Sequence, residues 1–162
     1  NKGAVIFPEK IQSKYVMYHR IPPHIWVAYS EDLLNWHDSN IVITPQYEWE
    51  YYKIGTGGPP IKTDYGWLVI YHTVDINMMY RLSYVITALD DPKKIIYKSE
   101  PIIEPKKEFE TQGDVANVVF TCGAVLIDDT VFVYYGGADT VICVATAKLE
   151  EFLVPLKLWR CS

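Results

Sequence analysis

The sequence predicts an all-β fold, a β-propeller of which about three blades lie in this chain. A strand-like segment occurs three times, each copy lies among further short apolar segments, and no stretch of a dozen residues shows helical periodicity. Short segments rich in Val, Ile, Tyr and Trp, separated by Gly, Pro, Asp and Asn, are typical of four-stranded antiparallel sheets.

The recurring segment reads YVMYHR at residues 15–20, LVIYHT at 68–73 and FVYYGG at 132–137, and the copies align without gaps at steps of 53 and 64 residues. A turn signal and another apolar segment precede each copy, and a further strand-like segment follows it. These flanking strands are expected, in chain order, at residues 4–11, 25–30, 58–63, 80–89, 117–126 and 141–149. Repeats of this length are typical of propeller blades, and we expect blades at 1–48, 49–108 and 109–162.

Composition and charge exclude several classes of function. Of the 162 residues, 49% are hydrophobic and 22% are charged, which describes a soluble globular protein rather than a disordered chain. The formal net charge is -5, and no run of Lys and Arg is dense enough to bind a nucleic-acid backbone. Every apolar run is interrupted before it reaches the length of a membrane span. We therefore expect neither a nucleic-acid partner nor a membrane partner.

Cysteines and histidines do not indicate a metal centre. Cys122, Cys143 and Cys161 are odd in number and form no C-x-x-C pair, so neither a disulfide framework nor a zinc site is expected. His19 and His24 stand five residues apart without an acidic or cysteine partner at ligand spacing. No metal or cofactor is predicted.

The number of repeats raises a problem of ring closure. Propellers pack the faces of neighbouring blades in a ring of at least four, so three blades would leave two apolar faces in water. Either the chain is the later part of a longer domain, with further sequence before Asn1, or copies of it associate as a homo-oligomer.

Polar residues at the ends of the repeated strands form the candidate site. Equivalent points of different blades converge on one funnel, which would bring together Arg20 with its neighbour His19, His72 and Asp139. Basic groups opposite a carboxylate suit an anion beside a polyol. In the alternative interpretation these residues are solvated strand ends and Asp139 caps a hairpin turn. Lys53 precedes a glycine-rich stretch, GTGGPP, which lacks the spacing of a phosphate loop and is weak evidence by itself.

Seven motifs follow one another along the chain: FPEKI, KYVMYHR, IWVAYSEDLLNW, KIGTGGPPIKT, GWLVIYH, NVVFTCG and YYGGADT. Together they resemble glycoside hydrolase family 130, the five-bladed β-mannoside phosphorylases, from Asn1 to about Leu156. The resemblance implies a five-bladed β-propeller whose last three blades lie in this chain.

The resemblance also implies a reaction, the inverting phosphorolysis of a β-mannoside to α-mannose 1-phosphate, with inorganic phosphate as co-substrate. The family's phosphate ligands fall on Lys2, Arg20, Lys53 and His72. A guanidinium holds phosphate oxygens in a bidentate fork, a lysine adds a point charge, and a histidine would be favoured as imidazolium beside a dianion. Asp139 falls at a position that contacts mannosyl hydroxyls, and Asn117 lies where the family lines the sugar pocket.

The family's general acid is an aspartate of an earlier blade, and its motif does not occur in this chain. The DDP at 90–92 is not that motif, because it lies on an outer turn. We therefore expect the acid upstream of residue 1 and predict that this chain alone is inactive. Gly3 stands where an aspartate is usual and could loosen the loop that carries Lys2.

Two alternatives stay open: a β-mannoside hydrolase of the same fold, and a non-catalytic carbohydrate-binding propeller. The basic set favours phosphorolysis, because a hydrolase needs a carboxylate to activate water. A cytoplasmic location is expected, since a cell would retain the sugar phosphate.

Overall fold

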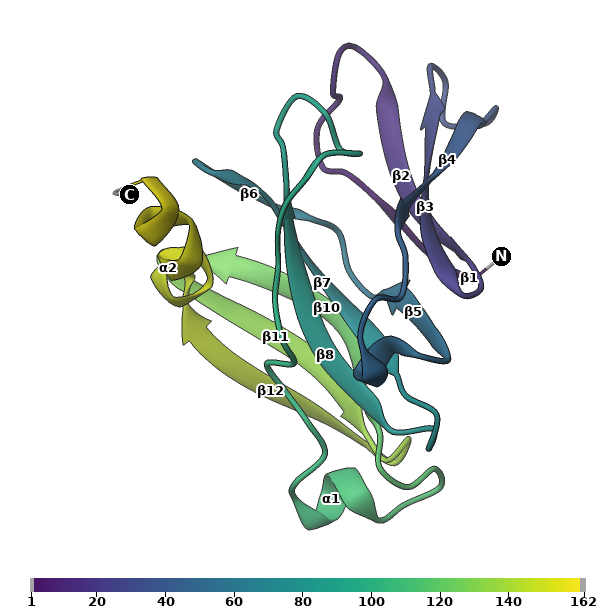
Figure 1. Ribbon diagram of the computed structural model, residues 1–162, viewed down its shortest axis with the longest axis vertical. Coiled ribbons are helices and arrows are strands. Elements are labelled where there is room, and N and C mark those ends of the chain that lie inside the picture. Colours follow the sequence, from purple (N-terminus) through teal and green to yellow (C-terminus); the bar gives the residue numbers. More distant parts are fainter. Residues whose placement is uncertain (1, 161–162) are drawn as a thin grey trace.

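The computed structural model describes residues 2–160, which form three antiparallel sheets (Figure 1). The first sheet contains β1 (Lys2–Ile6), β2 (Tyr15–Ile21), β3 (His24–Ser30) and β4 (His37–Ile43). The second contains β5 (Lys53–Thr56), β6 (Ile61–Thr63), β7 (Gly66–Val74), β8 (Tyr80–Thr87) and β9 (Ile95–Lys98). The third contains β10 (Val119–Ile127), β11 (Thr130–Gly137) and β12 (Val141–Lys148). The prediction of an all-β fold built from repeated antiparallel sheets is confirmed.

Helical segments are few. The 3-10 turn η1 (Glu48–Glu50) precedes β5, the single-turn helix α1 (Glu108–Thr111) precedes β10, and α2 (Leu149–Arg160) follows β12. None of the helices in residues 2–160 is long and apolar enough to cross a membrane.

The edge of β7 is shared by two short strands. β5 pairs with the end of β7, from Lys53 opposite Val74 to Thr56 opposite Tyr71, and β6 pairs with its beginning. Pro59 and Pro60 lie between the two short strands, and because proline has no N–H it cannot donate to a sheet ladder. The GTGGPP stretch is thus the interruption of an inner strand.

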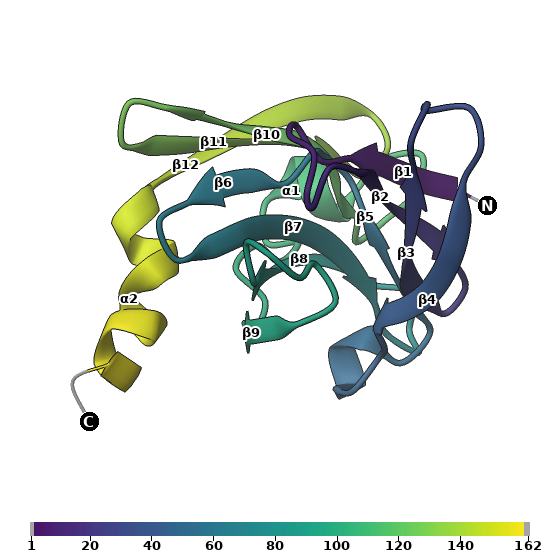
Figure 2. The ribbon, with the colours of Figure 1, turned by 90° about the horizontal axis from the view of Figure 1, so that it is seen from above.

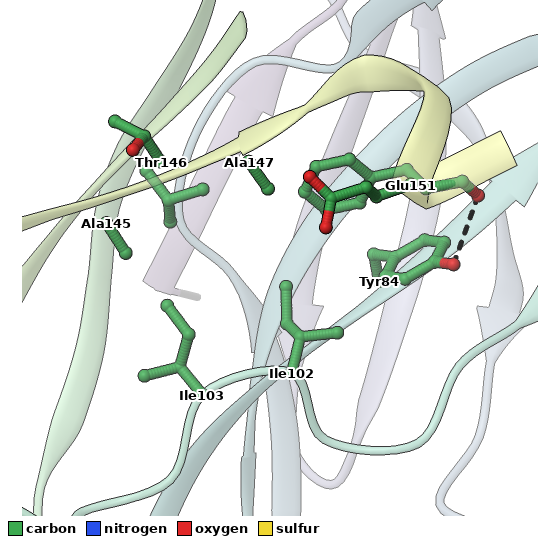
Figure 3. A pocket seen from close by; sticks show the side chains of 9 residues that line it. Tyr84, Ile102, Ile103, Ala145, Thr146, Ala147 and Glu151 are labelled. Atoms are coloured by element: carbon green, nitrogen blue, oxygen red, sulfur yellow. Dashed lines mark hydrogen bonds between the residues drawn. The ribbon is translucent and has the colours of Figure 1, made fainter.

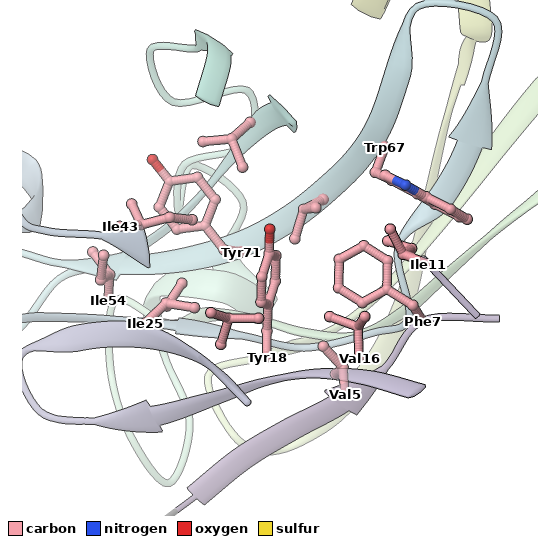
Figure 4. Packing of buried hydrophobic residues seen from close by; sticks show 13 residues of the cluster. Val5, Phe7, Ile11, Val16, Tyr18, Ile25, Ile43, Ile54, Trp67 and Tyr71 are labelled. Atoms are coloured by element: carbon pink, nitrogen blue, oxygen red, sulfur yellow. The ribbon is translucent and has the colours of Figure 1, made fainter. Parts of the chain in front are cut away.

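The second sheet lies between the other two, as Figure 2 shows from above. All nine residues of β7 are buried, because its side chains alternate between two packed faces. Trp67, Val69 and Tyr71 pack toward the first sheet, against a cluster that includes Val16 and Tyr18 (Figure 4). Within this cluster the Phe7 ring meets the Tyr18 and Trp67 rings edge to face, at centroid distances of 4.9 and 5.2 Å.

The other face of β7 packs toward the third sheet and α2. Leu68 and Ile70 meet a cluster that includes Val133, Tyr135 and the helix residues Phe152, Leu153 and Leu156. The sequence interpretation placed no helix here, and that was wrong. Apolar residues at 149, 152, 153 and 156 have helical spacing, but Pro155 inside the segment obscured it.

The third sheet has three strands in the described chain, because β12 leads into α2 where the first two sheets gain an outer strand. Its outward face is apolar and exposed, with Ile127 at 52%, Ile142 at 82% and Val144 at 52% of full exposure. This is one of the two open faces that a three-blade arc was expected to leave.

Candidate functional site

Arg20 and His72 meet at the junction of the first and second sheets. Arg20 Nη1 lies 3.3 Å from His72 Nε2, and the bond joins β2 to β7 across 52 residues of sequence. The hairpin that carries Arg20 is fixed there, since the Ile54 amide of β5 donates to the Pro23 carbonyl over 3.1 Å. The structure therefore brings together two of the residues that the strand ends predicted.

His72 is neutral in this arrangement. An arginine can only donate, so His72 Nε2 accepts the bond and the ring proton resides on Nδ1. Burial, reinforced by the positive charges of Arg20 and Lys53, lowers the pKa of His72 to about 3. The expected imidazolium is thus not the state of the free chain; it would require a bound anion to raise the pKa.

Lys53 completes the basic cluster from the first position of β5. Its Nζ lies 5.3 Å from the centroid of the Tyr52 ring and 5.4 Å from that of Tyr80, and the His72 ring stacks on Tyr80 with centroids 6.0 Å apart. Among residues 2–160, neither Arg20 nor Lys53 has a carboxylate within ion-pair distance. The cluster is therefore an uncompensated positive site, of the kind an anion would neutralise.

The glycines of GTGGPP make room for this cluster and for the neighbouring sheet. A Cβ atom on Gly55 would lie 2.7 Å from His72 Cε1 and 3.0 Å from Arg20 Cδ. A Cβ on Gly57 would lie 2.0 Å from the Thr121 side chain, and one on Gly58 would lie 2.7 Å from Gly123 Cα. The stretch is therefore explained by close packing of the inner strand, since no side chain fits at these positions.

Lys2 lies opposite Arg20 in the register of β1 and β2, with its side chain exposed. The adjacent Gly3 has φ +65°, and its carbonyl accepts a bond of 2.6 Å from the Thr56 hydroxyl. A Cβ at Gly3 would also lie 3.1 Å from the Thr56 carbonyl oxygen. This bond ties the start of β1 to β5 and opposes the loosening expected from Gly3.

A pocket of about 330 Å³ adjoins the cluster on the side of the third sheet. It is lined by Tyr80, Val115, Val118, Phe120 and Asp139. The Phe120 ring lies 4.5 Å from the His72 ring, so the aromatic wall of the pocket is also a wall of the basic cluster. Asp139 thus lines a cavity next to His72, and its φ of +54° places it in a tight turn at the same time.

Asn117 borders this pocket through its backbone. It has φ +61°, its side chain is exposed, and its carbonyl accepts a bond of 3.0 Å from the Tyr80 amide. The next residue, Val118, lines the pocket. Asn117 therefore lies at the border of the pocket, and its role in sugar binding stays a prediction.

His19 does not join the cluster. Neighbouring residues of a strand point to opposite faces, and the face of β2 that carries Tyr18 and Arg20 packs toward the second sheet. His19 points the other way, is 4% exposed, and has a pKa lowered by burial. His37, at the start of β4, forms bonds of 2.7 Å to Glu31 and 2.9 Å to Asp38.

Sequence reasoning missed Tyr80 and Phe120 as site residues, because an aromatic side chain in a strand is expected to pack between sheets. It also missed Glu50 and Glu110, two buried carboxylates that accept tyrosine hydroxyls. A repeated pattern marks both: PQYEWE at 45–50 and PKKEFE at 105–110 share proline, glutamate, an aromatic residue and glutamate at equal spacing.

A second pocket of about 330 Å³ lies between the second sheet, β12 and α2 (Figure 3). Its walls are mainly apolar, including Ile102, Ile103 and Phe152, and the Tyr84 hydroxyl donates to the Phe152 carbonyl over 3.1 Å. It contains none of the predicted site residues. In residues 2–160 no group of three or more His, Cys, Asp or Glu side chains is arranged to hold a metal ion, and Cys161 lies outside these residues.

Similarity to known proteins indicates the same family as the motifs do. Residues 1–158 match the family described as beta-1,4-mannooligosaccharide phosphorylase, glycoside hydrolase family 130. Two proteins of Thermoanaerobacter sp., a 1,2-beta-oligomannan phosphorylase and a beta-1,2-mannobiose phosphorylase, are 52% and 51% identical over 153 residues, or 93% of this chain and 52% and 51% of theirs.

The fold agrees as well. The solved structure of beta-1,2-mannobiose phosphorylase from Listeria innocua, in complex with beta-1,2-mannobiose, matches with a TM-score of 0.91 at 36% identity, over 97% of this chain and 47% of that protein. The chain spans about half the length of these relatives. It belongs to glycoside hydrolase family 130, whose members are five-bladed β-propellers.

Proposed function

We propose that this chain supplies the phosphate site and part of the mannosyl site of a β-mannoside phosphorylase. Arg20, Lys53 and His72 would hold phosphate, joined by Lys2 from the neighbouring strand. Asp139 would bind mannosyl hydroxyls in the adjoining pocket, with Asn117 at its border. The three sheets would be blades with boundaries at 1–48, 49–108 and 109–162.

The observation that supports this most is the uncompensated basic cluster. Burial, reinforced by the positive charges of Arg20 and Lys53, lowers the pKa of His72 to about 3, and no carboxylate of residues 2–160 lies within ion-pair distance of either cation. An inverting hydrolase needs a carboxylate base to activate water, whereas phosphate is itself the nucleophile. The groups around His72 are cationic or aromatic, which suits phosphorolysis.

In the proposed reaction a phosphate oxygen attacks the anomeric carbon of a β-mannoside and the bond from that carbon to the glycosidic oxygen breaks. Attack from the opposite face converts the β-linkage to α-mannose 1-phosphate. The departing oxygen receives one proton and becomes a hydroxyl of the acceptor sugar. The proposal assigns the proton donor to residues upstream of Asn1, so this chain alone would bind phosphate without turnover.

The linkage is proposed from the relatives. The two proteins that are 52% and 51% identical are named for β-1,2-linked substrates, whereas the family description names a β-1,4 linkage. We infer that a β-1,2-linked mannoside is the better first substrate to test.

The test incubates the whole protein with β-1,2- or β-1,4-mannobiose, with and without phosphate, and follows mannose 1-phosphate by ³¹P NMR. Phosphate-dependent appearance of the α anomer is expected. Release of free mannose without phosphate would establish the hydrolase instead, and sugar binding without either product would establish a binding propeller. Turnover by residues 1–162 alone would show that the acid has been misplaced.

A further inference from the structure

Glu50 is buried, and its carboxylate joins three segments: the linker before η1, β7 and β9. Its Oε1 accepts a hydrogen bond of 2.7 Å from the Tyr71 hydroxyl. Its Oε2 accepts hydrogen bonds of 2.8 Å from Lys98 Nζ and from the backbone N–H of Gln46. Lys98 Nζ also donates to the Thr44 carbonyl over 3.1 Å. A carboxylate that is 0% exposed is costly unless every oxygen is paired, so these donors hold the segment 44–50 firmly against β7 and β9.

The same arrangement recurs before the third sheet. Glu110 accepts the Tyr135 hydroxyl over 2.7 Å and the amides of Lys106 and Lys107 over 2.8 Å each. Tyr71 and Tyr135 occupy equal positions in the repeated strand, as Glu50 and Glu110 do in the repeated linker pattern. A buried carboxylate that accepts a hydrogen bond from a strand tyrosine therefore fixes the linker that enters the second sheet and the one that enters the third.

The linker held by Glu50 leads directly to Lys53. The Tyr52 amide donates to the Val74 carbonyl over 2.9 Å, and Lys53 begins β5 opposite Val74. Tyr71, the partner of Glu50, immediately precedes His72 in β7. The carboxylate thus ties the turn before Lys53 to the strand that carries His72, without touching the basic cluster itself.

We propose that Glu50 is a positioning residue for Lys53: its bonds to Tyr71 and Lys98 hold the η1 turn so that the Lys53 ammonium lies beside His72 and Arg20. The effect on phosphate affinity that this inference predicts rests on the proposed phosphate site. The placement of Lys53 relative to His72 can be measured without phosphate.

The first test is a double-mutant cycle on phosphate affinity, measured by calorimetry. Glu50→Gln removes the negative charge that pairs with Lys98 and leaves one side-chain oxygen as acceptor where there were two, so the turn should loosen and affinity should fall about 10-fold. Lys53→Gln should weaken binding at least as much. If Glu50 acts through Lys53, the double variant binds no more weakly than Lys53→Gln; additive losses would overturn the proposal.

Glu110→Gln is the matched control, because it removes the equivalent carboxylate from the linker of the third sheet. It should lower the midpoint of thermal unfolding comparably while leaving phosphate affinity within about twofold of the starting protein. An equal loss of phosphate affinity in Glu110→Gln would show that general loosening, rather than the placement of Lys53, is responsible.

The second readout is the pKa of His72, followed by NMR of the labelled histidine ring without phosphate. Because the Lys53 charge helps to lower this pKa, Glu50→Gln and Lys53→Gln should both raise it toward its ordinary value, and Glu110→Gln should not. An unchanged His72 pKa in Glu50→Gln overturns the positioning role. If the starting protein binds no phosphate, the phosphate site fails and the His72 titration still decides the role of Glu50.

Should Glu50→Gln fail to fold, Tyr71→Phe replaces it, since that change removes only the hydroxyl that donates to Glu50 Oε1. In Tyr71→Phe the pKa of His72 should rise as in Glu50→Gln, but by a smaller amount. A His72 titration identical to that of the starting protein in Tyr71→Phe would then overturn the proposal.

Discussion

Arg20 Nη1 donates to His72 Nε2 over 3.3 Å, so the guanidinium that is proposed to bind phosphate is held by a neutral histidine instead of a carboxylate. Carboxylate pairing would oppose an incoming anion, whereas a neutral acceptor orients the guanidinium and leaves its charge available. The other donors of Arg20 can then turn to a ligand. Among these, Arg20 Nε is buried without a partner in residues 2–160.

Arg20→Lys should therefore weaken phosphate binding while keeping the charge. A lysine cannot form the bidentate fork, and the loss of one charge-assisted bond corresponds to roughly 10-fold in affinity. Calorimetric titration with inorganic phosphate measures the effect. Arg81→Lys is the control, since the Arg81 guanidinium is already paired with two carboxylates, Asp75 at 2.8 Å and Glu104 at 3.1 Å. Equal phosphate affinity in Arg20→Lys and the starting protein would contradict the assignment.

His72 should make the stability of the free chain depend on pH. Its pKa is about 3 when folded and about 6.5 in an unfolded chain, so the unfolded state binds more protons between these values. Stability should accordingly fall as the pH falls from 6.5, by up to about 1.4 kcal/mol per pH unit. His72→Asn should remove this slope in urea unfolding experiments at pH 6.5 to 4.5.

Two comparisons sharpen the His72 prediction. The pKa of His37 is raised by hydrogen bonds to Glu31 and Asp38, so its contribution is present at low pH and is lost as the pH rises through the folded pKa. This contribution changes only above about pH 6.5, so His37→Asn should leave the slope between pH 6.5 and 4.5 unaltered and act at higher pH, with the opposite sign. Bound phosphate should raise the pKa of His72 and flatten the wild-type slope. A slope that His72→Asn leaves unaltered would refute the buried neutral histidine.

Much of the fold follows from local sequence, because turn residues and apolar alternation mark each strand. The meeting of Arg20 with His72 was also predicted, since both end repeated strands and repeated strands converge. The strand pattern alone could not choose between His19 and Arg20, because the choice depends on which face of β2 packs on the second sheet. Tyr18 packs toward the next sheet along the chain, whereas Tyr71, which the alignment pairs with it, packs toward the preceding sheet. Residues aligned without gaps therefore do not lie on equivalent faces of their sheets.

The remaining omissions have a common physical cause. Phe120 and Tyr80 become walls of the pocket only when β10 and β8 are brought beside His72, and a single sequence gives no measure of that approach. Glu50 reads as a charged linker residue until its three donors are in place. Such residues acquire their roles from contacts across the sheets rather than from their immediate neighbours.

Gly55 provides a steric test of the cluster. A Cβ there would lie 2.7 Å from His72 Cε1 and 3.0 Å from Arg20 Cδ, so both side chains must move in Gly55→Ala. We expect a loss of roughly 1–3 kcal/mol in the free energy of unfolding and at least about a 10-fold loss in phosphate affinity. Gly123→Ala is the matched control, because nothing lies within 4 Å of a Cβ at that position. Phosphate affinity that is unchanged in Gly55→Ala would separate the phosphate site from this cluster.

Asp139 should affect sugar binding and not phosphate binding. Its carboxylate lines the pocket beyond Phe120, and φ of +54° is a conformation that asparagine tolerates, so Asp139→Asn removes the charge without straining the turn. Loss of a hydrogen bond to a charged acceptor should weaken mannobiose binding by about 10- to 100-fold. Asp128→Asn is the control, because Asp128 has φ of +55° in the β10–β11 turn and is exposed. Calorimetry with mannobiose and with phosphate should show the loss for mannobiose only in Asp139→Asn. A parallel loss of phosphate affinity would mean that Asp139 supports the whole site instead of contacting the sugar.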